Sequence, residues 1–99
     1  MDRPQAQAIL ADLARDSGNI IVTHHAQERM DERGITWRQV VRCLEKGTIT
    51  EGPAPDLKGG WKLTVETISA GDPLAVVAAV TEDAQGNKAI VVTAYYPGQ

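Results

Sequence analysis

Three ionisable side chains recur every four residues in one short segment of the chain. The segment reads His25-Ala-Gln-Glu-Arg29-Met-Asp-Glu-Arg33-Gly-Ile. In a helix, residues four apart lie on one face, so His25, Arg29 and Arg33 would form a stripe. Imidazole exchanges a proton near neutral pH, and guanidinium groups bind phosphate oxygens through paired hydrogen bonds. The pattern therefore predicts a site for a phosphate group with an acid or base beside it.

The same stripe also has a purely structural interpretation. His25 would bond to the following turn, and Arg29 would pair with Glu28 or Glu32 along the helix. Arg33 would lay its aliphatic stem over the core while its charge stays in water. The pattern by itself leaves both interpretations open.

Other reactive side chains indicate a site less clearly. His24 lies four residues before Glu28, and His25 lies three residues before it. A metal site would need a third ligand from elsewhere, and no other residues at metal-ligand spacing point to one, so the sequence predicts no metal site. We find no glycine-rich phosphate loop and no dinucleotide fingerprint, so it predicts no cofactor. Cys43 is the single cysteine, which excludes an intrachain disulfide. We expect Cys43 to be a small packing residue at the edge of an apolar face.

Two helices are predicted to position the stripe. The first spans about residues 24–33, and Gly34 ends it because glycine accepts the left-handed conformation of a helix C-cap. The second spans residues 36–46, with Thr36 as its N-cap. Apolar residues at helical spacing form its predicted core face (Trp37, Val40, Val41 and Leu44), with polar residues opposite (Arg38, Arg42 and Glu45).

A further helix is predicted at the N-terminus, where Asp2 is an N-cap candidate and Pro4 lies in the first turn. The helix ends before residues 17–19. We expect it to cover its own sheet rather than a partner, because a small domain needs all its apolar surface. Its apolar residues recur at helical spacing: Ala6, Ile9, Leu10 and Leu13.

The remaining segments predict strands and turns. Residues 61–69 alternate, with Trp61 on one face and Lys62 on the other, and residues 74–80 are apolar throughout, as in a strand covered on both faces. We therefore expect an α+β fold with element order αβααββββ, an antiparallel twisted sheet of about five strands and helices packed on it. Residues 1–99 would form one domain, with residues 1–18 as a helical extension. The other predicted segments are strands at 20–23, 48–51 and 89–94, a loop at 52–60, and turns at 70–73 and 82–87.

Charge and composition limit the function. The formal net charge is −3, which argues against a broad nucleic-acid-binding surface. Residues 29–46 carry more basic than acidic side chains, whereas residues 48–99 carry the reverse, so a local anion site is expected in the helical part. We expect no signal peptide, and no apolar run approaches the ~20 residues that span a bilayer. A cytoplasmic location is expected.

The motif and the strand order together resemble a bacterial family of unknown function grouped with the RelE/ParE toxin superfamily. The motif is His-Ala-x-x-Arg-Met-x-x-Arg-Gly-Ile, and the resemblance covers residues 20–96. The aromatic Trp61 opening a long strand and the ending Val-Thr-Ala-Tyr at residues 92–95 are similar as well. The resemblance implies a RelE/ParE-like fold. Superfamily members include ribonucleases that cleave messenger RNA and poisons of gyrase.

A ribonuclease of this type needs no metal, because the RNA 2′-hydroxyl attacks the adjacent phosphate while the protein supplies an acid, a base and cations. His25 would be the acid or base, Arg29 would hold the phosphate, and Tyr95 would donate its phenolic proton or simply end a strand. Arg33 and Lys62 would bind the RNA, and Lys62 shares a strand face with Glu66.

Two functions follow from these observations. In the first, the chain is a toxin-like component of a bacterial toxin–antitoxin system, an endoribonuclease that a cognate antitoxin restrains. The antitoxin would cover the face of His25, Arg29 and Arg33 or add an element to a sheet edge. In the second, the chain is a non-catalytic interaction module that uses the sheet edge or the N-terminal helix, with another protein or a second copy in a homodimer as its partner.

Overall fold

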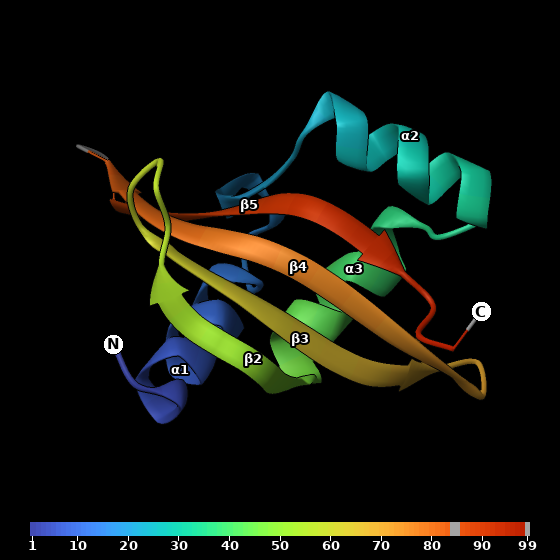
Figure 1. Cartoon of the computed structure of the whole chain (residues 1–99), viewed down its shortest axis with the longest axis horizontal. Helices are drawn as coiled ribbons and strands as arrows, with labels where there is room; N and C mark the ends of the chain where they lie inside the picture. Colours follow the sequence, from blue (N-terminus) through green and yellow to red (C-terminus); the bar gives the residue numbers. More distant parts are fainter. Residues whose placement is uncertain (84–85, 99) are drawn as a thin grey trace.

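The computed structural model describes residues 1–83 and 86–98. It confirms the α+β class, with three α-helices and five strands (Figure 1). The predicted turn at 82–87 lies partly outside the described residues. In chain order the elements are α1 (Arg3–Leu13), the short 3₁₀ helix η1 (Ser17–Asn19), β1 (Ile20–Val22), α2 (His24–Arg33), α3 (Trp37–Lys46), β2 (Thr48–Pro55), β3 (Trp61–Ser69), β4 (Asp72–Asp83) and β5 (Gly86–Tyr95).

The five strands form one mixed sheet in the order β1-β5-β4-β3-β2. Strands β2 to β5 run antiparallel to their neighbours, as predicted, but β1 pairs parallel with β5. The prediction of a wholly antiparallel sheet was therefore wrong at this edge. Short turns force consecutive strands to run antiparallel, whereas α2, α3 and three strands separate β1 from β5, so no turn dictates their relative direction.

A register shift in β5 decides which residues face outwards near its end. Val77 of β4 pairs with Thr93 and Ala78 pairs with Val91, so Val92 is an extra residue in β5. Beyond this bulge, Ala94 remains in the core, and the alternation of the strand turns Thr93 to the opposite face.

The helices cover only one face of the sheet. In Figure 1, α1 and α3 lie behind the sheet and α2 runs along the outer side of β5. The strand β4 was expected to be covered on both faces, but none of the helices in the described residues lies over its second face. Ala75 and Ala79 of that face are still buried, because small side chains are screened by their neighbours on the adjoining strands. The largest fully buried core side chains are Leu10, Met30, Leu63, Leu74, Val40, Val65, Val76, Val91 and Cys43.

The orientation of α3 differs from the prediction at its first turn. Val40, Cys43 and Leu44 form its buried line, and Cys43 lies in the core rather than at its edge. Trp37, expected in the core, is 41% exposed. At about 100° per residue, Trp37 lies roughly 60° around the helix from Val40, on the flank of the buried line.

The N-terminal helix packs on its own chain, as expected, because Ala6, Leu10 and Leu13 belong to the common core. Its side chains also cover the edge strand β2. Arg3 donates from Nε to the carbonyl of Gly52 at 2.7 Å and from Nη2 to that of Thr50 at 3.3 Å, and the Gln7 amide donates to the carbonyl of Gly47. Strand β2 also runs four residues beyond its predicted end, and its position at the sheet edge tolerates prolines.

Within the described residues, no helix has both the length and the apolar character needed to cross a membrane.

The buried thiol of Cys43 gives a test of this packing. Its Sγ donates to the carbonyl of Val65 at 3.4 Å. Burial, with a smaller contribution from the charge of Glu66, raises the pKa of the Cys43 thiol from 9.0 to about 12. We expect iodoacetamide to leave the native protein unmodified at pH 8 and to modify it fully in denaturant. Fast modification of the native protein would contradict the packing.

The same shift predicts a pH dependence. The folded state keeps the Cys43 thiol protonated above the pKa that this thiol has in the unfolded state. The contribution of Cys43 to the free energy of unfolding is therefore complete below pH 9.0 and is lost as the pH rises towards about 12. The difference in free energy of unfolding between the wild type and Cys43→Ala should therefore narrow over this range. Denaturant titrations at several pH values measure this difference. Other groups that titrate in the same pH range are present in both proteins, so their contributions cancel in the comparison.

Candidate functional site

The helix α2 is held in a defined orientation at both ends and along one face. Thr23 caps its start, accepting from the amide of Ala26 at 3.1 Å, and Gly34 ends it in the left-handed conformation with φ of 68°. Ala26 and Met30 are buried and belong to the common core. This packing leaves the stripe of His25, Arg29 and Arg33 on the flank of the helix.

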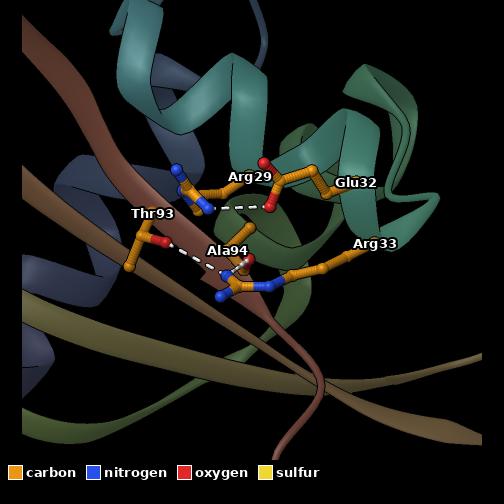
Figure 2. A network of polar contacts seen from close by, with 5 residues as sticks. All are labelled: Arg29, Glu32, Arg33, Thr93 and Ala94. Atoms are coloured by element: carbon orange, nitrogen blue, oxygen red, sulfur yellow. Dashed lines mark hydrogen bonds and ion pairs between the residues drawn. The ribbon is translucent and has the colours of Figure 1, made fainter.

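Arg33 joins the end of α2 to the end of β5. Its Nη1 donates to the carbonyl of Ala94 at 2.8 Å and to Thr93 Oγ1 at 3.4 Å, as Figure 2 shows. Its Nε and Nη2 make no hydrogen bond to any residue that the structure describes. The guanidinium is therefore fixed by one nitrogen, and its other donors are available to a ligand.

A groove of about 620 Å³ lies beside this guanidinium. Its size is in the range of ligand pockets. Two residues of the sequence prediction, Arg33 and Tyr95, meet in its wall although they are far apart in the chain. The lining residues are Glu32, Arg33, Thr93, Tyr95 and Tyr96.

Arg29 lies next to the groove but not in its lining. Its Nη1 donates to Glu32 Oε2 at 2.7 Å, which fixes the position of one wall carboxylate (Figure 2). Its Nε is buried without a hydrogen-bond partner among the described residues. Arg29 therefore acts on the groove through Glu32, in the ion pair that the structural interpretation expected.

His25 lies outside the groove. It is exposed in the first turn of α2, eight residues before Arg33, which at 1.5 Å per residue is about 12 Å along the helix. It makes no side-chain hydrogen bond to the part of the chain that the structure describes. The adjacent His24 pairs with Glu28 at 3.0 Å. Across residues 1–83 and 86–98, no three metal-ligating side chains gather into a cluster.

Lys62 also lies away from the groove. It is paired with Ala79 of β4, whereas Tyr95 is paired with Ala75 of the same strand. The two positions are four residues apart along β4, about 13 Å at 3.3 Å per residue. Lys62 instead lines a separate hollow with Glu51 and neighbouring residues of β2.

Three groove residues were not predicted as site residues. Glu32 was considered only as a partner of Arg29. Thr93 could have been found, because it lies two residues before Tyr95 and alternate residues of a strand share a face. Tyr96 had no signal in the sequence. Its hydroxyl accepts from the Gln39 amide at 3.4 Å, a contact between distant segments.

The fold and the groove define a small α+β domain with a cleft between the ends of α2 and β5. Its family is the domain of unknown function DUF4258, whose model matches residues 22–96, so the chain belongs to it. The matched region contains every residue that lines the groove and excludes α1. No curated protein and no solved structure matches the chain significantly.

The link between Arg33 and β5 predicts a measurable loss of stability. Arg33→Met keeps the aliphatic stem but removes both hydrogen bonds, and we expect a loss of about 1 kcal/mol in the free energy of unfolding. Urea denaturation measures this value. Arg38→Met is the matched control, because Arg38 makes no hydrogen bond within the described residues and should change little. Equal stability of the two variants would argue against the link.

Proposed function

We propose that the chain is the toxin-like component of a bacterial toxin–antitoxin system and cleaves messenger RNA in the cytoplasm without a metal. The observation that supports this proposal is the meeting of Arg33 and Tyr95 in one groove, with donors of the guanidinium left available. A fixed cation beside a phenol supplies two of the groups that phosphodiester cleavage needs. Messenger RNA as the substrate follows the resemblance to the RelE/ParE superfamily.

The reaction would be an internal transfer of the phosphoryl group. The RNA 2′-oxygen attacks the adjacent phosphorus, and the bond from phosphorus to the 5′-oxygen of the next nucleotide breaks. The products are a 2′,3′-cyclic phosphate and a free 5′-hydroxyl. The 2′-hydroxyl loses one proton and the leaving oxygen gains one, so the step needs one base and one acid.

The groove offers a group for each role. The carboxylate of Glu32, held by Arg29, accepts the proton of the 2′-hydroxyl. Arg33 binds the non-bridging phosphate oxygens and stabilises the charge that develops there, through donors that make no bond within the fold. Tyr95 donates its proton to the leaving oxygen. This assignment uses Arg29 as a positioning residue and gives no step to His25.

Removing the proton donor tests the assignment. We expect Tyr95→Phe to lower kcat by about 100-fold or more with little change in KM, because general acid catalysis contributes at least this factor. His25→Ala should cleave within about threefold of the wild type, since His25 lies about 12 Å from Arg33 along α2. Cleavage of an end-labelled RNA, with identification of the cyclic phosphate, measures both. Induced expression should arrest growth for the wild type and His25→Ala but not for Tyr95→Phe.

Two results would contradict the proposal in different ways. Full cleavage by Tyr95→Phe, or loss of cleavage in a folded His25→Ala, would show that the roles are assigned wrongly. Absence of both cleavage and growth arrest in the wild type would refute the nuclease itself.

A non-catalytic interaction module is the second candidate, and the uncovered sheet face favours it. On this face Ile21 is 46% exposed and Ile68 is 67% exposed, six residues apart along β4, and a partner or a second copy that spans the face would bury both. Strand addition at β2 is less favoured, because Arg3 occupies the carbonyls of Thr50 and Gly52 in that strand. A cognate antitoxin would therefore cover this face or the groove. Harmless expression together with a stable complex in sedimentation experiments would support the module.

A further inference from the structure

The exposed side of α3 carries an aromatic side chain in a shallow groove that the proposed reaction does not use. Trp37 lines this groove, of about 420 Å³, with Val41 of the next turn and Ser17 of η1. Trp37 is 41% exposed, so its indole presents an apolar surface in this groove on which a planar group can stack.

Three cations form a stripe beside Trp37. Arg38, Arg42 and Lys46 follow one another at intervals of four residues, are exposed, and line the same groove. None of them forms an ion pair with another described residue, whereas Arg29 and Arg33 are bound within the fold. The positive charge of residues 29–46 is thus presented mainly by α3. Glu45 is the acidic residue in the groove, so the stripe keeps a positive excess.

We propose that this side of α3, from Trp37 to Lys46, is a binding site for single-stranded RNA that lies outside the groove of Arg33 and Tyr95. The indole of Trp37 stacks on one base, and the three cations contact successive phosphates of the strand. Cations four residues apart are about 6 Å apart along the helix, a suitable spacing for the phosphates of an extended strand. Stacking aromatics beside a cationic track are the usual means of binding single strands without sequence preference.

The position of Trp37 favours RNA over an acidic segment of a protein. Trp37 follows Arg33 by four residues, across the short connection between α2 and α3 (Figure 1). Gln39 lies about 200° around α3 from Trp37, beside Arg42 of the cationic stripe. It donates to the Tyr96 hydroxyl in the groove wall. The stripe and the groove are therefore linked through Gln39 and Tyr96, although the indole itself lies on the other flank of α3. The inference rests on the proposed function, since it gives that reaction's substrate a second point of attachment.

A non-cleavable probe separates binding from cleavage. We would use a fluorescein-labelled 12-nucleotide oligouridylate with 2′-O-methyl groups, which removes the attacking hydroxyl, and measure its anisotropy. In a Trp61→Phe background, quenching of the remaining tryptophan reports on Trp37. We expect Trp37→Ala to weaken binding about 5-fold to 150-fold, because stacking contributes roughly 1–3 kcal/mol per base. Trp37→Phe should retain much of the affinity.

The salt dependence tests the cationic stripe. With three phosphate contacts, the slope of log Kd against log salt has a magnitude of about 2, from roughly 0.7 per contact. Replacing Arg38, Arg42 and Lys46 together by glutamine should remove most of this slope. Arg42→Gln alone should reduce it by about 0.7. Lys58→Gln changes the net charge equally in the loop between β2 and β3, and should leave the slope unchanged.

The outcomes distinguish this inference from the proposed function. His25→Ala should bind the probe as the wild type does, because His25 lines neither groove. Probe binding through α3 by a wild type that cleaves no RNA would refute the nuclease and support the RNA site. Wild-type affinity in folded Trp37→Ala and in the triple variant would overturn the RNA site. So would tighter binding of polyglutamate than of RNA, which would indicate an acidic protein partner.

Discussion

The outer edge of β5 must have its backbone groups satisfied, and much of the structure depends on how this is achieved. The parallel strand β1 pairs with residues 89–91 of β5, and the amide of Thr23 then donates to the carbonyl of Val91 at 3.3 Å. Farther along, Arg33 of α2 donates to the carbonyl of Ala94. A strand, a helix cap and a guanidinium thus cover one edge in turn. This arrangement fixes α2 beside β5 and leaves little of the edge open to unwanted strand pairing.

The groove is a consequence of this arrangement. The bulge at Val92 keeps Ala94 in the core while the alternation of β5 turns Thr93 outwards. The guanidinium that completes the edge then lies against the same strand as Tyr95. Arg33 therefore has a structural role and a proposed functional role at once, because one nitrogen bonds to the backbone and the other donors remain available. Because its structural bonds already hold it, the cation would lose little conformational freedom on binding the phosphate of the proposed substrate.

The arginines of the helical part divide according to their surroundings. Arg29 and Arg33 come from a helix packed along a strand edge, where a carboxylate and a carbonyl lie within reach. Arg38 and Arg42 come from the outer side of α3, where the stripe meets water. Arginines at equal helical spacing are thus bound wholly or in part within the fold on α2, whereas those of α3 form no ion pair with a described residue. A chain with a net charge of −3 can in this way present a local cationic surface.

The sequence by itself determined the elements of this protein and their order. The end of α2 and the start of α3 follow from Gly34 and Thr36, and alternation in β3 identified its buried side, because caps and periodicity act between residues close in the chain. Only the tertiary structure decided the parallel pairing of β1, the exposure of Trp37, and the meeting of Arg33 with Tyr95 while His25 and Lys62 stay apart. These features depend on contacts between segments far apart in the sequence and on the rotation of each helix against the sheet, and neither local propensity nor spacing encodes them.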